Sequence, residues 1–461
     1  MDPVDLFRRT AATVPAYRAF LAAHDIDPAR VTSLRDFARL PMTTKQTYTR
    51  RYPLPDLCRG GTIGDMIAVS SGSTGTPSFW PRSAEDERVI AARFEEIFRD
   101  AFGARDKRTL AVVCFALGTW VGGLFTLACL RHLAGRGYPI TSIAPGSDKR
   151  EIVRVIPELA PHFDQVVLLG YPPFLKDVID TGGLPWRDYA IKMVTAGEVF
   201  SEEWRSLVAE RAGMTDPTRD TASLYGTADA GVLGNETPLS IEIRRFLAAH
   251  PGTAREIFGE SRLPTLVQYD PEVRFFEEHE GTLLFSGDNG IPLVRYHIAD
   301  EGGLLPYERM LGLLAGHGFT PSAPGPERPF VYVFGRSHFT VSYYGANVYP
   351  ENIAVGLEQP EVSGMVSGKF VLEVVEDEQR DRRLTVTVEL MPGLRPDERI
   401  ARAVGSSILA QLRRLNSEFA AYVPGERQAP EIRLRETGDP EYFPPGAKHR
   451  YTRAPSRGDD L

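Results

Sequence analysis

The residues with the clearest chemical potential lie at positions 70–77, where the sequence reads Ser-Ser-Gly-Ser-Thr-Gly-Thr-Pro. The stretch follows an apolar run at 66–69 that predicts a short buried strand. Glycine lets the backbone approach a ligand closely, and backbone N–H groups together with hydroxyls can surround a polyanion. The predicted phosphate-binding residues are Ser70, Ser71, Gly72, Ser73, Thr74 and Gly75. The lysine of the usual P-loop is absent, and an ordinary surface turn has the same composition.

A second group of chemically useful residues is the segment 225–231, Tyr-Gly-Thr-Ala-Asp-Ala-Gly. The ring of Tyr225 can stack on a base, and the hydroxyl of Thr227 can donate to a phosphate. Asp229 is a candidate Mg²⁺ ligand, because this ion prefers oxygen atoms. The segment, which also contains Gly226, fits equally an Asp/Gly turn that carries a packed tyrosine.

Two single charged residues complete the set of candidates. Asp300 lies in the segment 295–303, where we expect it before a turn, and its carboxylate can accept hydrogen bonds from both hydroxyls of a ribose. A surface salt bridge is the alternative there. Lys448 stands in a Pro/Gly stretch and is one of only seven lysines among 53 basic residues. It can swing onto a phosphate as a point charge, or it is a solvated lysine near the C-terminus.

Strands that alternate with helices are predicted to position these residues. Continuous apolar runs at 109–116, 165–170 and 191–198 predict strands buried on both faces, and helices are expected at 150–160 and 201–212. This alternation is typical of a parallel α/β sheet, in which ligands bind at the carboxyl ends of the strands. Four residues lie at such ends besides the Ser/Gly stretch: Gly118, Tyr171, Gly197 and Glu198.

The composition of the chain changes towards its end. Short antiparallel strands are predicted within 260–300, and the stretches 370–377 and 384–390 alternate apolar and polar residues as a hairpin does. A helix is expected from about residue 396 to 418. We therefore predict an α/β fold with a large N-terminal domain of packed α/β subdomains and a smaller β region, followed by a small mobile α+β domain. The two predicted domains are 1–335 and 336–461.

Composition and charge exclude several classes of protein. The chain has 461 residues, 42% of them hydrophobic, and a net charge of −8 without any basic run, which argues against nucleic-acid binding. Its three cysteines are too scattered for a zinc site or a disulfide framework. There is no signal-peptide core at the N-terminus and no apolar run of membrane-spanning length. We therefore expect a cytoplasmic protein without a membrane or nucleic-acid partner.

Taken in order, the motifs resemble the adenylate-forming superfamily, and within it the phenylacetate–CoA ligase family. The resemblance extends over nearly the whole chain and rests on the sequence of weak motifs rather than on any one of them. The matching segments are 36–45, 70–77, 195–198, 225–229, 295–300, 335–336, 344–350 and Lys448.

The resemblance implies a reaction in two steps. A carboxylate attacks the α-phosphate of ATP and gives an acyl-adenylate and pyrophosphate; the small domain then rotates, and a thiol or an amine displaces AMP. We expect an AMP-forming ligase that uses ATP, Mg²⁺ and CoA and acts on a small-molecule carboxylic acid. The alternatives are an amine or other nitrogen acceptor in place of CoA, and a nucleotide-binding relative without enzymatic activity. A homodimer is a further expectation.

The same resemblance assigns roles to the nucleotide-binding residues. The Ser/Gly stretch would hold the β- and γ-phosphates, and the segment containing Ala196, Gly197 and Glu198 would lie along the adenine. Asp300 would fix the ribose, with Arg336 nearby.

The catalytic roles and the acid pocket follow in the same way. Thr227 would contact the α-phosphate, Asp229 would hold Mg²⁺, and Lys448 would stabilise charge in the first step only. Three aromatic residues follow predicted strands and are candidate walls of a pocket for an aromatic or otherwise apolar acid: Phe115, Trp120 and Tyr171. Packing in the core is an equal alternative for each of them.

Three departures from the family pattern point to a divergent, biosynthetic relative. Thr76 stands where a lysine is usual, so that one cation on the pyrophosphate is missing. Asp229 replaces the usual glutamate and is one methylene shorter, so that its contact with the metal is expected through water. His338 stands where an aspartate is usual at the hinge.

Overall fold

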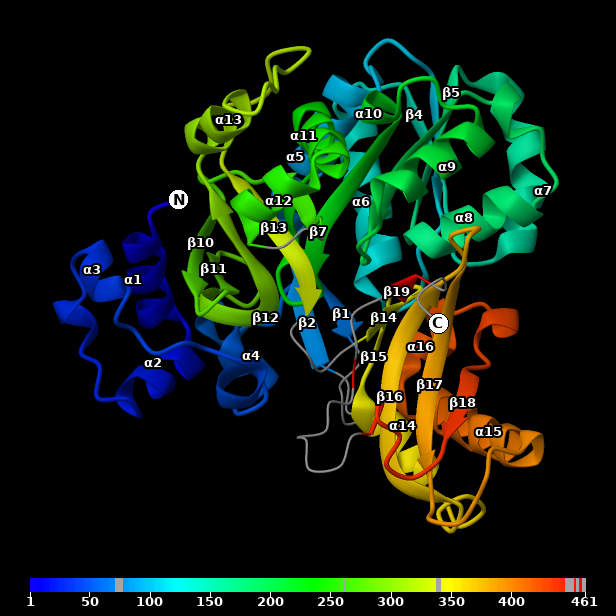
Figure 1. The fold of residues 1–461 in the computed structure, drawn as a ribbon. Coiled ribbons are helices and arrows are strands. Elements are labelled where there is room, and N and C mark those ends of the chain that lie inside the picture. The colour runs from blue at the N-terminus through cyan, green and yellow to red at the C-terminus, as the bar shows by residue number, and fades with distance from the viewer. Residues whose placement is uncertain (71–77, 260–262, 337–340, 444–451, 453–455, 458–461) are drawn as a thin grey trace. The chain divides into compact units, whose positions relative to one another are not determined.

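The computed structural model describes the chain apart from residues 71–77, 260–262, 337–340, 444–451, 453–455 and 458–461 (Figure 1). The described residues form two compact units, each with a sheet of its own. The first comprises Met1–Ser70, Phe79–Gly170 and Leu175–Gly335. The second comprises Tyr171–Phe174 and, chiefly, the described residues from Arg336 onward. The assignment of the ranges 1–335 and 336–461 as domains stays a prediction.

A mixed sheet of eleven strands forms the centre of the first unit as far as that unit is described. The strand order is β10-β11-β12-β13-β9-β8-β7-β6-β5-β3-β4. The pairs within β7-β6-β5-β3-β4 are parallel, whereas β8 pairs antiparallel with both β7 and β9. The bounds are β3 Thr109–Val113, β4 Ile140–Ile143, β5 Gln165–Gly170, β6 Ile191–Ala196, β7 Thr221–Thr227, β8 Gly231–Asn235, β9 Thr265–Gln268, β10 Arg274–His279, β11 Thr282–Gly287, β12 Leu293–Leu305 and β13 Phe330–Arg336.

The parallel part of this sheet lies where the apolar runs predicted it. Every residue of β3 and β5 is buried, as expected for strands that are covered on both faces. The predicted strand at 109–116 ends three residues early, at Val113, and the one at 191–198 ends at Ala196. Apolar character continues beyond a strand when the following loop is also buried, and therefore overestimates strand length. The predicted mixed α/β class is confirmed; the mobility of its last part stays a prediction.

Helices connect these strands. Several begin at a side-chain cap: Ser83 and Asp86 form a reciprocal capping box at α5, and Ser201 caps α9. The helix α5 ends at Glu96 and continues as a π-helical turn, Ile97–Ala101. The bounds are α5 Ala84–Glu96, α6 Val121–Gly135, α7 Lys149–Leu159, α8 Pro172–Thr181, α9 Glu202–Ala212, α10 Pro217–Asp220, α11 Pro238–Ala249, α12 Pro251–Phe258 and α13 Tyr307–Ala315.

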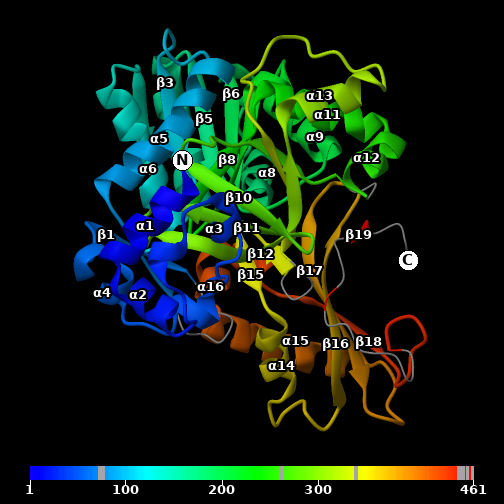
Figure 2. The ribbon, with the colours of Figure 1, turned by 90° about the vertical axis from the view of Figure 1, so that its left-hand side faces the viewer.

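The N-terminal helices pack on the antiparallel end of the sheet. Figure 2 shows α1 and α3 against β10 and β11, and one apolar core joins the helices to these strands. Phe7, Tyr17 and Phe20 lie in this core together with Phe285 and Tyr296. The strands β1 and β2 form a separate two-stranded sheet, in which β1 precedes the Ser/Gly stretch and β2 follows it. The bounds are α1 Pro3–Thr13, α2 Pro15–Ala22, α3 Leu34–Phe37, α4 Leu54–Leu57, β1 Met66–Ser70 and β2 Ser78–Arg82.

The second unit is an α+β structure around a sheet of order β18-β17-β16-β19. The predicted hairpin is present as β16 and β17, which pair antiparallel. The helix predicted at 396–418 is interrupted at Asn416, whose side chain caps the next helix by accepting from the N–H of Phe419. The bounds are β14 Val341–Tyr343, β15 Ala346–Val348, α14 Pro350–Leu357, β16 Val366–Glu376, β17 Arg382–Leu390, α15 Glu398–Leu415, α16 Ser417–Tyr422, β18 Glu431–Arg435 and β19 Ser456–Arg457.

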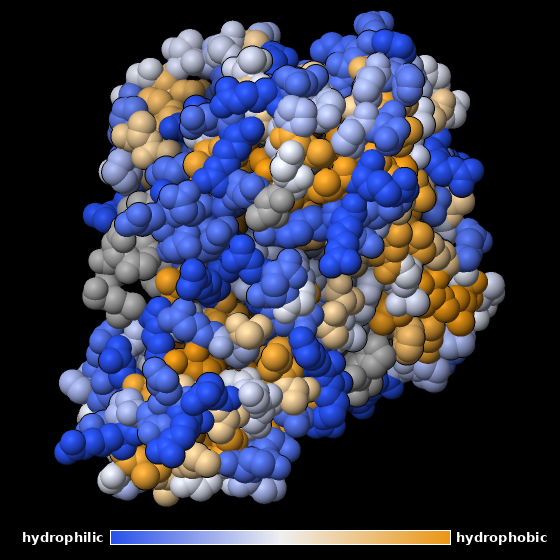
Figure 3. Space-filling model, turned by 90° about the vertical axis from the view of Figure 1, so that its right-hand side faces the viewer, coloured by the Kyte–Doolittle hydropathy of each residue, from blue (hydrophilic) through white to orange (hydrophobic). Residues whose placement is uncertain are grey.

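The surface is mixed in character. On the face drawn in Figure 3, hydrophilic residues cover large areas and hydrophobic residues gather in patches between them. In the described part of the chain, no helix combines the length and the apolar character that crossing a membrane requires.

Two glycines provide a matched test of the packing around β12. A Cβ atom added at Gly302 would lie 2.0 Å from the carbonyl oxygen of Tyr332, whereas one added at Gly312, in α13, meets nothing within 4 Å. We predict that Gly302→Ala lowers the free energy of unfolding by about 1–3 kcal/mol through overpacking. Gly312→Ala should raise it by about 0.4–1 kcal/mol, because alanine favours a helix. Denaturant unfolding of both variants checks this, and equal effects would contradict the described packing.

Candidate functional site

The carboxylate of Asp229 lies in the tight turn between β7 and β8, and only 3% of the residue is exposed. Thr227 stabilises this turn, because its hydroxyl accepts a hydrogen bond from the backbone N–H of Ala230 at 3.2 Å. A hydroxyl also has one proton to donate, so Thr227 can hold the turn and donate to an anion at once. The turn thus presents a hydroxyl and a carboxylate two residues apart.

Two side chains from distant parts of the sequence contact Asp229. The hydroxyl of Tyr296 donates to Oδ2, and Nζ of Lys45 lies 3.4 Å from Oδ1. The side chain of Lys45 is 22% exposed, against 4% for that of Asp229, so solvent reaches the ion pair from the lysine side. Burying a carboxylate is costly unless it is paired and hydrogen-bonded. These two contacts supply both the cation and the hydrogen bond.

Pairing between the N-terminal segment and β12 brings Lys45 to this position. The backbone N–H of Thr43 donates to the carbonyl of Arg295 at 3.0 Å, and the N–H of His297 donates to the carbonyl of Thr43 at 2.9 Å. Thr44 then caps the π-helical turn Lys45–Thr49 through a reciprocal capping box. Lys45 is therefore fixed by backbone hydrogen bonds two residues away on one side and by a capped turn on the other.

Lys45 also connects Asp229 with the strand that leads into the Ser/Gly stretch. Its Nζ atom lies 5.6 Å from the centroid of the Trp80 ring, within the range of a cation–π contact. The indole N–H of Trp80 donates to Oγ of Ser70 at 2.9 Å, and Ser70 is the last residue of β1. The first predicted phosphate-binding residue is thus tied through Trp80 and Lys45 to Asp229.

Two buried arginines hold the backbone on either side of Asp229. Arg82, the last residue of β2, donates to the carbonyl of Ala228, and Arg274 donates to the carbonyl of Ala230 at 3.4 Å. Burial lowers the pKa of both guanidinium groups, to about 10 for Arg274, and Asp229 opposes the shift at Arg82. A pKa of about 10 leaves Arg274 protonated at neutral pH. The group that donates to the carbonyl of Ala230 is therefore a cation.

Tyr225 and Asp300 meet near the ends of β6 and β7. The hydroxyl of Tyr225 donates to Oδ2 of Asp300 at 2.7 Å, and both residues are buried. Ala196, the last residue of β6, pairs with Leu224, so that it lies beside Tyr225 across the sheet. The first unit therefore brings together Ala196, Tyr225 and Asp300, while Gly197, with a φ of +88°, turns the chain away from β6.

The local structure around Asp300 differs from the sequence-based expectation. Asp300 was expected before a turn, but it lies inside β12, which continues to Leu305. The register of β12 against β11 shifts next to it, and Ala299 has a φ of +64°. A bulge redirects the side chain that follows it. A left-handed alanine costs energy, so the surrounding packing must hold this bulge in place.

Several predicted site residues cannot be placed. Ser71, Gly72, Ser73, Thr74 and Gly75 lie outside the described residues, and so do Thr76, His338 and the predicted catalytic residue Lys448. Of Arg336, the structure gives the backbone at the end of β13. Their roles stay predictions.

The three candidate pocket walls occupy different environments. Phe115 follows β3 and is buried, and Tyr171 follows β5 and is buried. Trp120 is half-buried and forms an isolated parallel bridge with Val69, beside the strand that ends at Ser70. The role of these residues in binding an acid remains a proposal.

Five residues of this site were missed by sequence reasoning: Lys45, Trp80, Arg82, Arg274 and Tyr296. Lys45 lies in the segment 36–45 that carries part of the family resemblance, and it is one of seven lysines in the chain. Scarcity of lysine was the available signal. The described residues contain no group of three or more His, Cys, Asp or Glu side chains that could hold a metal ion by themselves.

Sequence comparison links the chain to named enzymes. No family model matches it. The phenylacetate–coenzyme A ligase of Aromatoleum evansii is 23% identical over 418 residues, which cover 86% of this chain and 82% of that enzyme. The enzymes of the same name from Thermus thermophilus and Escherichia coli are 25% and 24% identical over 364 and 400 residues, covering 76% and 82% of this chain and 72% and 78% of theirs.

Structural comparison gives the same fold. A crystal structure of 2-hydroxyisobutyryl-CoA ligase, in complex with 2-HIB-AMP and CoA in the thioesterification state, superposes with a TM-score of 0.64 at 16% identity. The superposition covers 99% of this chain and 89% of that one. An open conformation of the same ligase gives a TM-score of 0.53 at 16% identity, covering 98% and 90%.

Fold and sequence together define the class of protein. The chain has the fold of an adenylate-forming enzyme, as the order of its motifs predicted. In sequence, the chain is similar to phenylacetate–CoA ligases over most of its length. The predicted resemblance to this family is thereby confirmed, and the comparisons support an AMP-forming acid–CoA ligase.

A double-mutant cycle tests the pair formed by Lys45 and Asp229. We predict that Lys45→Met alone lowers the free energy of unfolding by about 1–3 kcal/mol, because it leaves a buried carboxylate without its cation. In the background of Asp229→Asn, the same substitution should cost clearly less, since no charge remains to be paired. Denaturant unfolding of the four proteins measures the coupling. Additive effects would show that the two side chains do not interact in solution.

Proposed function

We propose that this ATP-dependent, AMP-forming ligase activates an aromatic or otherwise apolar carboxylic acid as its acyl-adenylate and passes the acyl group to CoA. The observation that carries the proposal is the group around Asp229. One buried carboxylate, one hydroxyl and one lysine converge in the first unit, beside the ends of β6 and β7. This is where an open α/β sheet binds its ligands.

The nucleoside end of ATP is assigned to the pair formed by Tyr225 and Asp300. A carboxylate can accept about four hydrogen bonds, and the hydroxyl of Tyr225 donates one of them to Asp300. Asp300 can therefore also accept hydrogen bonds from both ribose hydroxyls. Ala196, Gly197 and Glu198 would lie along the adenine, next to the ring of Tyr225. The contiguity of Ala196, Tyr225 and Asp300 in the first unit supports this assignment.

The phosphate end is assigned to Thr227, Asp229 and Lys45. Thr227 would donate to the α-phosphate. Lys45 lies on the solvent side of its ion pair, so it can turn its charge towards a phosphate and supply the cation that is missing at Thr76. Preorganised charge of this kind is the main contribution that a protein makes to such a transfer.

Asp229 is the residue at the phosphate end that would hold a bound Mg²⁺. Mg²⁺ is commonly held by one or two carboxylates together with substrate phosphates, and Asp229 is a single carboxylate at the phosphate end. The ion would neutralise charge on the phosphates. Because Tyr296 and Lys45 already contact its two oxygens, Asp229 would reach the metal through water or after Lys45 has turned away.

The acceptor step rests on the sequence alone. Lys448 would stabilise the charge that develops in adenylation, and movement of the second unit would remove it before CoA attacks. Phe115, Trp120 and Tyr171 are the proposed walls of the acid pocket. Their apolar surface favours an aromatic or apolar acid over a charged one.

A screen of carboxylic acids with the full chain tests this function. Aromatic, branched aliphatic and dicarboxylic acids are each incubated with ATP and Mg²⁺, and release of AMP is measured without an acceptor, with CoA and with an amine. We predict AMP release that requires an aromatic or apolar acid and increases with CoA. If AMP release does not change with CoA but increases with the amine, CoA is not the acceptor and the enzyme forms an amide instead. No nucleotide turnover with any acid would overturn it.

The role of Lys45 is tested against a matched surface lysine. We predict that Lys45→Gln lowers kcat/KM for ATP in the adenylation step by about 10²-fold, as expected for the loss of a charge that faces the reacting phosphate. Lys107 is an exposed lysine that precedes β3, and none of the residues assigned to the phosphate end is next to it in the sequence. Lys107→Gln should therefore leave kcat/KM within about twofold. Equal kinetics for the two variants would exclude Lys45 from the phosphate site.

A further inference from the structure

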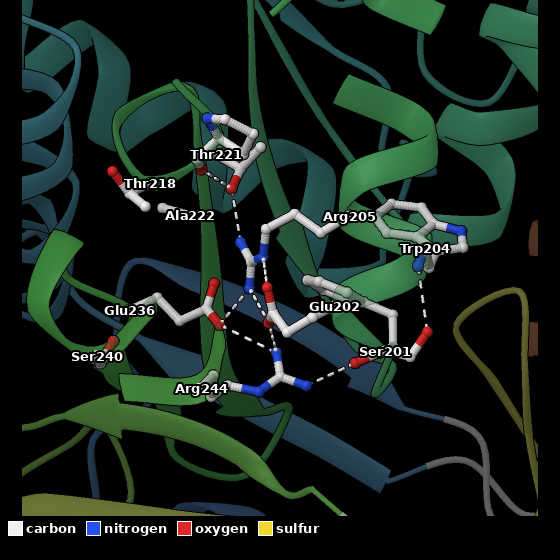
Figure 4. A network of polar contacts seen from close by, with 12 residues as sticks. Ser201, Glu202, Trp204, Arg205, Thr218, Thr221, Ala222, Glu236, Ser240 and Arg244 are labelled. Carbon is white, nitrogen blue, oxygen red and sulfur yellow. Dashed lines mark hydrogen bonds and ion pairs between the residues drawn. The ribbon is translucent and has the colours of Figure 1, made fainter. Parts of the chain in front are cut away.

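A buried group of four charged side chains lies behind the proposed adenine segment. It consists of Glu202 and Arg205 on α9, Glu236 after β8, and Arg244 on α11, and we call it the charge quartet (Figure 4). All four residues are at most 5% exposed. Charged residues are almost never this deeply buried unless they are paired.

The quartet is internally neutral and closely connected. Nε of Arg205 lies 2.9 Å from Glu202 and its Nη2 lies 2.7 Å from Glu236, while Nη1 of Arg244 lies 3.0 Å from Glu202 and 3.3 Å from Glu236. Each arginine therefore bridges both glutamates, as Figure 4 shows. Burial raises the pKa of Glu202, but Arg205 and Arg244 outweigh that effect and the net pKa is lowered. Burial likewise lowers the pKa of Arg205, but Glu202 and Glu236 outweigh it and the net pKa is raised. Glu202 and Arg205 are therefore held in their charged forms.

The quartet is anchored to the segment that connects β6 with α9. Nη2 of Arg244 donates to the backbone carbonyl of Phe200 at 2.6 Å. The guanidinium groups of Arg205 and Arg244 lie 4.9 and 5.5 Å from the centroid of the Phe200 ring. Ser201 then caps α9 through the N–H of Trp204. The segment 197–201, which begins with Gly197 and Glu198, is thus fixed at its far end.

The same group also contacts the strands beside this segment. Arg205 donates to the hydroxyl of Thr221, the first residue of β7, and the backbone N–H of Glu236 donates to the carbonyl of Ser223 at 2.7 Å. The strand β7 carries Tyr225 two residues further on. The quartet therefore sets the position of the segment 197–201 relative to the strand that carries Tyr225.

We propose that the charge quartet is a positioning device that holds the segment 197–201 against β7 and thereby sets the affinity for ATP. Stability does not explain a group of this kind, because buried ion pairs can often be replaced by apolar residues of similar volume without loss. Four charges with fixed hydrogen-bond directions, in contrast, allow one arrangement of the backbone to which they are bonded. The inference rests on the proposed function, since it assumes that this segment lies along the adenine.

Arg244→Met tests the proposal, with Lys192→Met as its control. Methionine keeps the length of the side chain but removes the hydrogen bond to the carbonyl of Phe200. Lys192 is near the other end of β6 and forms a largely buried ion pair with Asp220, so its replacement also removes a paired charge next to the same strand. Dissociation constants for ATP are measured by calorimetry on the full chain, together with KM for ATP, kcat and thermal unfolding.

We expect Arg244→Met to raise the dissociation constant and KM for ATP by about tenfold or more, while kcat at saturating ATP changes by less than about threefold. Lys192→Met should leave the dissociation constant within about twofold, whatever it does to thermal unfolding. Arg244→Lys, which keeps a positive charge and N–H donors on a single nitrogen, should restore part of the affinity, and it serves as the test if the methionine variant does not fold.

The measurements distinguish a failure of the proposed function from a failure of the positioning role. If the wild-type chain binds no ATP, the proposed function fails before the quartet is tested. If the wild type binds ATP and the folded Arg244 variants bind it equally well, the positioning role is wrong. The same conclusion follows if Lys192→Met weakens ATP binding as much as Arg244→Met does.

Discussion

The site depends on keeping one nearly buried carboxylate charged and correctly placed. Asp229 lies in a tight turn, and four separate parts of the chain are needed to hold it. Lys45 supplies the cation, Tyr296 supplies a hydrogen bond from β12, and Arg82 and Arg274 fix the backbone on both sides. Because an unpaired buried charge costs several kcal/mol, on the order of 3–5 kcal/mol when a partner is removed, these segments must assemble together.

The need to hold Asp229 accounts for the way in which the N-terminal segment packs in the first unit. The N-terminal helices α1 to α4 pack on the antiparallel end of the sheet, and the segment after them pairs with β12, which brings Lys45 to Asp229. The bulge at Ala299 lets the same strand present Asp300 to Tyr225. One irregular strand thus carries Asp300 and supports Asp229 through Tyr296, the two carboxylates that are proposed to contact different parts of one nucleotide.

Sequence reasoning recovered the parallel strands and the order of motifs, because continuous apolar runs and glycine-rich turns are local signals. It identified Asp229, Tyr225 and Asp300 as candidates, and the structure brings Tyr225 and Asp300 into contact. It did not find Lys45 or Tyr296 as partners of Asp229, since these contacts join segments that are 184 and 67 residues apart in the sequence. The charge quartet was equally hidden, because Glu202, Arg205, Glu236 and Arg244 look like ordinary solvent-exposed charges until helices and strands bury them.

The most direct test of the account is acid-dependent exchange of labelled pyrophosphate into ATP, which reports adenylation without any acceptor. The account predicts exchange by the wild-type chain in the presence of an aromatic or apolar acid. In Asp229→Asn the exchange rate should fall by about 10²-fold or more, because the phosphate end of the site loses its carboxylate. Exchange at the wild-type rate in a folded Asp229→Asn variant would contradict the central role given to this residue.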